Sequence, residues 1–146
     1  MLFSRLLIFC AIMVFTALSS YGSQIESIPV LPGKWHSKVT STHNMLKEPI
    51  VKEDTQCVDK TEYNPEEMVP QQEKCSVSNV KQKSNYLEYD MTCTGDGKIP
   101  PVKAHVVLKH EKKSYQMNMV GNTTVDGKEF KSEVNVVGTY VGPCDK

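Results

Sequence analysis

The residues that could support acid–base, nucleophilic or metal chemistry are scattered along this sequence of 146 residues. The histidines form neither an H-x-H pair nor an H-E-x-x-H motif; they are His36, His43, His105 and His110. No G-x-S-x-G elbow, phosphate-binding loop or calcium loop occurs either. The adjacent carboxylates, Glu53-Asp54 and Glu66-Glu67, lie in polar stretches that are typical of solvated surface. We therefore predict no catalytic residue, no metal and no cofactor, and a protein that is not an enzyme.

The cysteines are the most informative residues of the chain. Beyond the N-terminal apolar segment the cysteines are Cys57, Cys75, Cys93 and Cys144, each far from the next and without a C-x-x-C pair. An even number of separated cysteines in a small exported chain predicts two structural disulfides rather than a redox or zinc site. Four cysteines allow three connectivities. We favour Cys57–Cys75, which would close the irregular segment between them, and Cys93–Cys144, which would anchor the last strand.

The N-terminal segment has the layout of a secretory signal peptide. Arg5 precedes an apolar run from Leu6 to Leu18, and small residues follow it. Cleavage after Ser19 or after Gly22 fits this pattern. The apolar run is shorter than the roughly 20 residues that a membrane-spanning helix needs. We predict a signal peptide at residues 1–22, followed by a single disulfide-stabilised, β-rich domain at residues 23–146.

The charge balance excludes partners that need a strong field. The chain carries 17 basic and 17 acidic residues. Arg5 is its only arginine, so removing the leader leaves 17 − 1 = 16 lysines against 17 carboxylates, a net charge of −1. Such a surface has no field to gather a polyanion, and it has no guanidinium for two-point phosphate contacts. We therefore expect no nucleic-acid partner.

Alternation of apolar and polar residues predicts a series of β-strands. At residues 86–93, for example, Leu87, Tyr89 and Met91 alternate with Glu88 and Asp90. The same pattern occurs, in stronger or weaker form, at residues 33–42, 49–58, 76–84, 102–110, 114–121 and 129–140. His36 and His105 fall on polar faces, whereas His110 is in register with the apolar face of its strand.

Turn residues set the connections between these strands. Asp126-Gly127 lies between two strand patterns and predicts a tight hairpin, whose central positions need positive φ. Asn64 and Pro65 are typical of a helix start, so we predict one short helix at about residues 65–69, ended by Pro70. The fold class is therefore mainly β: a single antiparallel, strongly curved meander sheet or open barrel, with one short helix and two disulfides.

One sheet face is rich in methionine and tyrosine. The side chains that would share it are Tyr89, Met91, Tyr115, Met117 and Met119. Methionine fills irregular spaces and makes adaptable contact surfaces. An ordinary core explains the pattern, and the functional alternative is an apolar groove for a lipid or a partner peptide.

Several short motifs together are similar to a known family. They are Pro32-Gly33-Lys34-Trp35, then the separated cysteines, then Met91-Thr92-Cys93, and a closing Gly-x-x-x-Gly-Pro-Cys that ends at Cys144. The chain resembles, over about residues 31–144, a bacterial family of exported four-cysteine proteins known as a domain of unknown function. Its members have an opening P-G-x-W, a mid-chain M-x-C and a C-terminal G-x-C. The arginine-free, lysine-rich body of this chain departs from the usual pattern.

The resemblance implies a Gram-negative envelope protein in the periplasm, or one tethered to the inner membrane if the leader is not cleaved. It brings no catalytic residues to carry over. We expect a non-enzymatic protein that binds or stabilises another envelope component, such as a secretion or envelope-assembly complex. The alternative is a carrier that holds a lipid or a small apolar molecule on the methionine- and tyrosine-lined sheet face.

Overall fold

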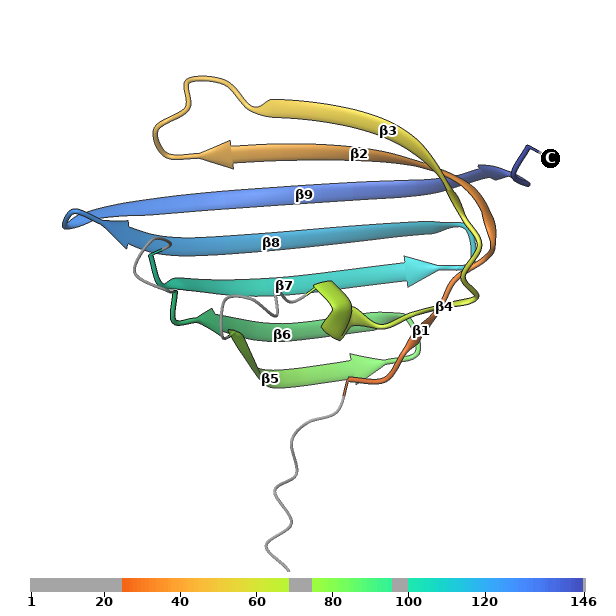
Figure 1. The fold of residues 1–146 in the computed structure, drawn as a ribbon, viewed down its shortest axis with the longest axis horizontal. Coiled ribbons are helices and arrows are strands. Elements are labelled where there is room, and N and C mark those ends of the chain that lie inside the picture. Colours follow the sequence, from red (N-terminus) through yellow and green to blue (C-terminus); the bar gives the residue numbers. More distant parts are fainter. Residues whose placement is uncertain (1–24, 69–74, 96–99, 146) are drawn as a thin grey trace, which may run out of the picture.

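A computed structural model describes residues 25–68, 75–95 and 100–145, so the predicted signal peptide lies outside the described residues. Most of this chain forms one antiparallel sheet of seven strands (Figure 1). The strands are β2 (Gly33–His43), β3 (Ile50–Val58), β5 (Cys75–Lys83), β6 (Tyr86–Cys93), β7 (Val102–Glu111), β8 (Ser114–Val125) and β9 (Lys128–Gly142). Each overlaps one of the predicted strand segments, with ends that differ by a few residues. Within these ranges, no helix is long and apolar enough to cross a membrane.

The strand order is β3-β2-β9-β8-β7-β6-β5. Strands β5 to β9 form the predicted meander, and the β2–β3 hairpin adds to it because β2 pairs with β9. The β8–β9 hairpin turns at the predicted place: Asp126 and Gly127 have φ values of 50° and 74°, and Val125 pairs with Lys128. Among the described residues β3 and β5 do not pair with each other, so both are edges and the sheet stays open.

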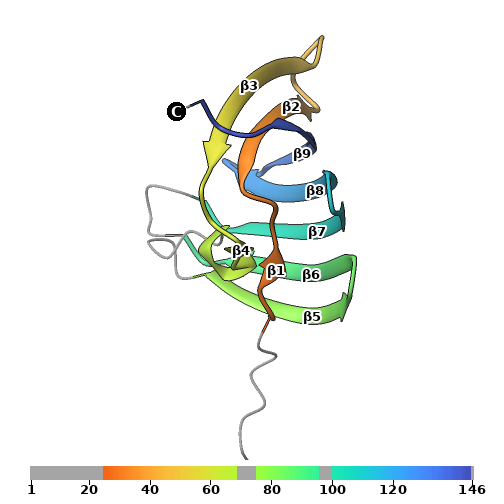
Figure 2. The same ribbon diagram turned by 90° about the vertical axis from the view of Figure 1, so that its right-hand side faces the viewer.

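The sheet is strongly curved, as predicted (Figure 2). Its two faces differ in chemistry. Along β7 the alternation is complete: Ala104, Val106 and Leu108 are buried, whereas Lys103 and His105 are exposed. Cross-strand register extends the apolar face to both sides, with Leu108 opposite Leu87 on β6 and Met117 on β8. This apolar face is the concave one, and it holds the core.

A strap of irregular chain crosses one end of the concave face. We define it as residues 25–31 together with residues 58–65; the two parts pair through β1 (Ile28–Pro29) and β4 (Glu62–Tyr63). Ile25 and Ile28 are buried in the core against Leu87 and Leu108. Two hydrogen bonds of 2.9 Å join the backbone of Glu26 to the side chain of Gln82 on β5. The strap therefore covers part of the apolar face of the sheet.

The predicted short helix is a single 3₁₀ turn, η1 (Pro65–Met68), which leads out of the strap. The backbone N–H of Glu67 donates to the carbonyl of Asn64, as expected for a turn that begins at Asn64-Pro65. Pro65 itself is fully buried. The remainder of the segment up to Cys75 lies outside the described residues.

All four cysteines form disulfides, but the favoured pairing is wrong: the bonds are Cys57–Cys144 and Cys75–Cys93. Cys75 and Cys93 are directly opposite each other in the β5–β6 pair, with Cα atoms 4.0 Å apart. Cys57 lies on β3 at the other edge of the sheet, so it cannot reach Cys75. It bonds instead to Cys144, 5.6 Å away between Cα atoms, because β2 holds β3 on one side and β9 on the other.

We predict that the two disulfides stabilise the fold unequally. The bond Cys57–Cys144 spans 87 residues and Cys75–Cys93 spans 18. In the chain-entropy view their loss costs about 4.5 and about 3 kcal/mol, respectively. Denaturant unfolding of Cys57→Ala/Cys144→Ala and Cys75→Ala/Cys93→Ala proteins measures both values. Peptide mapping without reductant checks the connectivity, and a peptide joining Cys57 to Cys75 would refute the strand order described above.

Candidate functional site

A cavity lies between the strap and the concave face of the sheet. Its volume is about 400 Å³, within the range of small-molecule sites. The strap contributes Ile28, Val30, Leu31, Val58 and Tyr63, and the sheet contributes Trp35, Leu108, Tyr115, Met117 and Val136. We call this space the strap cavity. Its walls are mostly apolar, and the charged residues that line it belong to the strap and to the β7–β8 turn.

The five predicted groove residues all lie on the concave face, but only two of them line the strap cavity. Tyr115 and Met117 do so, from β8. Tyr89 is buried in the core, where burial raises the pKa of its phenol. Met91 and Met119 pack against that core without lining the cavity. The tertiary structure therefore divides the predicted surface between core and cavity.

The remaining wall residues were not identified from the sequence. Trp35 on β2 and Val136 on β9 do carry the right signal, since each lies in an alternating segment with its side chain on the apolar face. The strap residues carry no such signal, because Val58 ends a strand whose other residues are all exposed and Tyr63 belongs to a two-residue strand. Only the path of the strap across the sheet brings them to the cavity.

An aromatic cluster shapes one wall of the cavity. The ring of Trp35 lies 5.7 Å from that of Tyr115 and 5.8 Å from that of Tyr140, between centroids. The hydroxyl of Tyr115 is 2.9 Å from the hydroxyl of Ser37, and the indole N–H of Trp35 donates to the carbonyl of Leu31 at 2.8 Å. The second bond ties the strap directly to the cluster.

Glycine at position 138 makes this arrangement possible. Ser37 on β2 and Tyr115 on β8 both pair with Gly138, which lies between them on β9. The Tyr115 ring crosses Gly138 to reach Ser37, and a Cβ atom at that position would lie 2.0 Å from the ring. A side chain there would push the ring away from both Ser37 and Trp35.

Burial shifts the pKa values of two titratable side chains that line the cavity. Desolvation raises the pKa of Tyr63 on the strap, so its phenol stays neutral. Desolvation lowers the pKa of His110 on β7, which favours the neutral imidazole. His110 therefore behaves as a polar but uncharged group at the edge of an apolar space.

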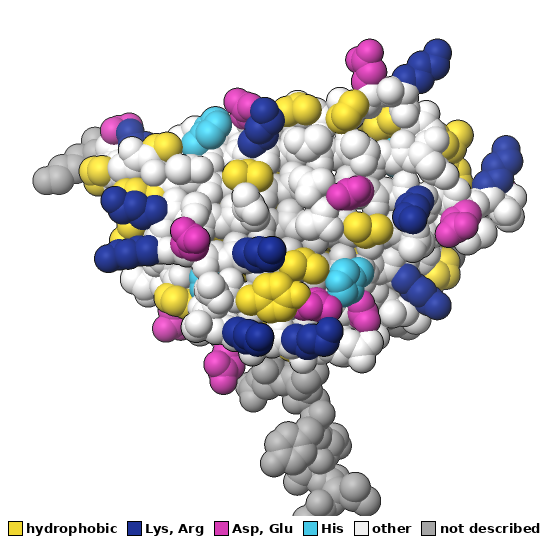
Figure 3. Space-filling view, turned by 180° about the vertical axis from the view of Figure 1, so that it is seen from behind, with side chains coloured by type: hydrophobic (Ala, Val, Ile, Leu, Met, Phe, Trp, Pro, Cys, Tyr) yellow, Lys and Arg dark blue, Asp and Glu magenta, His cyan; other side chains and the backbone are white. Residues whose placement is uncertain are grey.

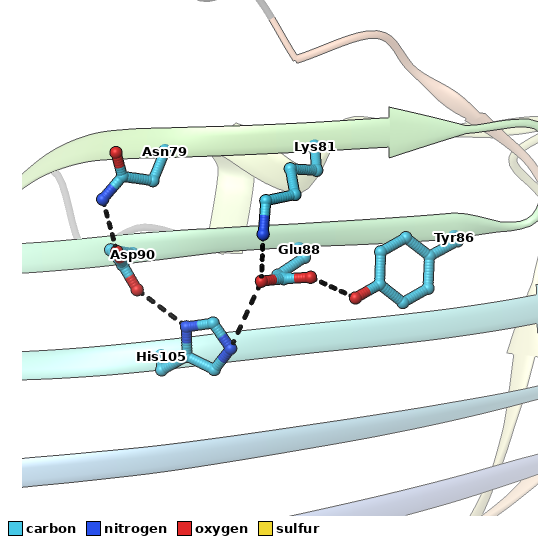
Figure 4. Close-up of polar contacts among 6 residues, drawn as sticks. All are labelled: Asn79, Lys81, Tyr86, Glu88, Asp90 and His105. Carbon is cyan, nitrogen blue, oxygen red and sulfur yellow. Dashed lines mark hydrogen bonds and ion pairs between the residues drawn. The ribbon is translucent and has the colours of Figure 1, made fainter.

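The convex face is polar and carries charges of both signs (Figure 3). Its most connected cluster spans three strands around His105 (Figure 4). The imidazole Nδ1 of His105 lies 2.7 Å from a carboxylate oxygen of Asp90, and its Nε2 lies 3.8 Å from Glu88. Glu88 also accepts from Lys81 at 3.0 Å and from the hydroxyl of Tyr86. These partners come from β5, β6 and β7 at neighbouring register positions.

Hydrogen bonds lower the pKa values of the two carboxylates in this cluster. Those from Tyr86 and Lys81 lower the pKa of Glu88, and those from Asn79 and His105 lower the pKa of Asp90. The cluster lies on the polar face of the sheet, where its side chains are partly exposed, and none of its residues lines the strap cavity. Of the other histidines, His36 contacts Thr55 and Glu53 on this face, and His43 accepts a backbone N–H near the β2–β3 turn. The described residues contain no group of three that could hold a metal ion.

A serine and a lysine with S-x-x-K spacing also lie here. A bulge in β5 between Ser78 and Lys81 places them opposite Asp90 and Glu88, on one face. The bond to Glu88 raises the pKa of Lys81, which keeps its amine protonated and unsuited to act as a base. The pair therefore belongs to the surface network.

The comparisons with known proteins give a family. Residues 30–144 match the family described as "Protein of unknown function (DUF3617)". That match covers most of the chain, including the second part of the strap (residues 58–65), every strand of the seven-stranded sheet and all four disulfide cysteines, but it begins after β1. The chain belongs to this family. No curated protein and no solved structure matches it significantly.

We predict that Gly138→Ala destabilises the protein by about 1–3 kcal/mol, the usual cost of forcing atoms into a packed site. Gly121→Ala is the matched control, because Gly121 also lies on the concave face of the sheet and a Cβ there would lie 3.2 Å from the Ser132 hydroxyl and 3.9 Å from the Lys103 carbonyl oxygen. Its effect should stay below about 1 kcal/mol. Urea unfolding monitored by tryptophan fluorescence gives both values. Equal losses in the two variants would mean that Tyr115 does not cross Gly138.

Proposed function

We propose that the protein binds a small apolar molecule, with a linear hydrocarbon chain as its main part, in the strap cavity. The observation that carries this proposal is the cavity itself: about 400 Å³ enclosed between the strap and an apolar sheet face. An ordinary core would be filled by its own side chains at close packing. Here Trp35, Met117 and Val136 instead face a space large enough for a ligand.

The proposed setting is the bacterial cell envelope, with the protein in the periplasm after cleavage of the leader, or tethered to the inner membrane without it. Two disulfides support an oxidising compartment. A binding protein of this kind would carry or present its ligand without changing it chemically.

We predict that filling the cavity abolishes binding. Val136 lines the cavity, whereas the next residue, Val137, is exposed on the convex face. Val136→Phe should weaken binding of N-phenyl-1-naphthylamine and of lauryl alcohol at least tenfold, because the added ring occupies the ligand's space. Val137→Phe adds the same ring outside the cavity and should leave affinity unchanged. Fluorescence titration and native mass spectrometry provide the measurements.

Two results would contradict this function. The first is a wild-type protein that is free of ligand when purified natively and shows no saturable binding of either probe. The second is binding that Val136→Phe and Val137→Phe weaken equally, which would place the ligand elsewhere.

A second proposed function is docking of another envelope protein on the β3 edge. Every residue of β3 from Ile50 to Cys57 is exposed, and the strand pairs with β2 without interruption. The other edge, β5, is broken by a bulge near Asn79, which has a φ of 55°. Bulges discourage edge-to-edge pairing, so β3 is the better acceptor for an extended segment of a partner.

We predict that this docking depends on backbone amides of β3. The Thr55 amide donates to the Asp54 side chain and so does not point at β2. Because amides alternate in direction along a strand, the Val51 amide points outward as well. Val51→Pro removes that donor and should abolish co-purification of a partner crosslinked in intact cells, whereas Val51→Ala keeps the amide and should preserve it. Retention of the partner by the Val51→Pro protein would exclude strand addition at this edge.

A further inference from the structure

His110 lies where two hollows of the concave face meet. The first is the strap cavity. The second has a volume of about 530 Å³ and lies on the other side of β1, toward the β5 edge. Ile28, Pro29 and His110 line both. His110 is therefore a sheet residue at the boundary between the two spaces, next to the β1 part of the strap.

The two hollows differ in chemistry. The strap cavity is walled mainly by hydrocarbon and aromatic side chains. The second hollow is lined largely by polar residues: Glu26, Ser27, Gln82, Lys83 and Ser84. A molecule with an apolar tail and a polar head would match this gradient, with its tail in the strap cavity and its head at His110.

The imidazole of His110 has no hydrogen-bond or ion-pair partner within the described parts of the chain, whereas its backbone N–H donates to the carbonyl of Asn85. His105, five residues earlier on the same strand and on its opposite face, is held by the carboxylates of Asp90 and Glu88. Within the described residues, His105 therefore has carboxylates at ion-pair distance, whereas His110 has no charged partner at that distance. A half-buried polar group without a partner is a place where a ligand can supply one.

We propose that His110 binds the carboxylate of an aliphatic acid whose hydrocarbon chain lies in the strap cavity. This inference rests on the proposed ligand-binding function and adds the class of ligand: a fatty acid rather than a neutral lipid. The imidazole donates an N–H to a carboxylate oxygen, and on protonation it forms a charge-assisted bond.

The field around His110 does not favour either sign by itself. The titratable groups that line the two hollows beside it are Glu26, Lys60, Glu62, Tyr63, Lys83, Glu111, Lys112 and Tyr115. Three of these are glutamates and three are lysines, so their formal charges cancel. Lys60 is in addition paired with Glu67 at 3.1 Å. Selectivity for an acid then depends on the group that meets its head directly.

The sign of the pH dependence follows from linkage. Burial lowers the pKa of His110 in the free protein, and a bound carboxylate raises it again. Binding of the acid therefore takes up protons in the interval between the two pKa values. Affinity for the acid should rise as the pH falls from about 8 to about 6, whereas affinity for an alcohol of the same chain length should not.

The test compares laurate with lauryl alcohol on wild-type, His110→Phe and His105→Gln proteins, by displacement of N-phenyl-1-naphthylamine. His110→Phe keeps the site apolar and should lower the ratio of laurate affinity to alcohol affinity about tenfold, the effect of one charge-assisted hydrogen bond. His105→Gln, on the opposite face, should bind both as the wild type does. NMR titration should show the His110 imidazole pKa rising on addition of laurate and the His105 signal unaffected.

The outcomes separate this inference from the function on which it rests. Equal binding of laurate and the alcohol, a His110→Phe protein that keeps its preference for laurate, or an unmoved His110 titration would overturn the role of His110 while leaving the cavity as an apolar site. Tighter binding of dodecyl phosphate than of laurate would overturn the carboxylic acid as the ligand class. Failure of both lauryl compounds to bind would overturn the inference and the proposed function together.

Discussion

The apolar concave face of the sheet must be kept from water. The curvature of the sheet and the path of the strap both serve to bury it. An antiparallel sheet with one apolar face is stable only if it closes, meets another layer or is covered. The described part of this chain provides little helical material for a second layer, since η1 is a single turn. Curvature brings the apolar side chains toward one another, and the strap covers one end by burying Ile25 and Ile28 against Leu87 and Leu108. Burial of two isoleucine side chains contributes about 3–6 kcal/mol, which is large compared with the net stability of a small domain.

The same requirement explains why a cavity remains. The strap follows its own short pairing, β1 with β4, and is tied to the sheet at a few points, chiefly through Gln82 and Trp35. Between these points its backbone spans the concave face without filling it. Tyr115, held over Gly138 by Ser37 and Trp35, keeps one wall in place. The aromatic cluster and the strap thus leave a cavity between them. In a closed sandwich or a narrow barrel, residues of this kind would pack together and fill that space.

The two disulfides act at opposite edges of the sheet. Cys75–Cys93 joins the last pair of strands at the β5 edge, and Cys57–Cys144 joins the β3 edge to the chain end after β9. An open sheet has two frayable edges, and each receives one covalent bond. The convex face adds networks such as that around His105, which are solvent-exposed and contribute modestly to stability. Cross-linking therefore compensates for a small core: among the described residues, nine hydrophobic side chains are buried besides Pro65.

Local pattern alone determined the mainly β class, every strand of the large sheet, the turn at Asp126-Gly127 and the apolar face with its methionines, because alternation and turn chemistry act between near neighbours. The resemblance likewise pointed to a family of unknown function, and the chain belongs to such a family. Local pattern does not determine the disulfide pairing. Cys57 and Cys75 are consecutive cysteines in the sequence, yet strand order places them at opposite edges of the sheet. The cavity was equally hidden, since Val58 and Tyr63 reach it only through the path of the strap, and His110 acquires its position between two hollows the same way. Contacts between distant segments depend on how the sheet curves and what crosses it, and that is a property of the assembled tertiary structure.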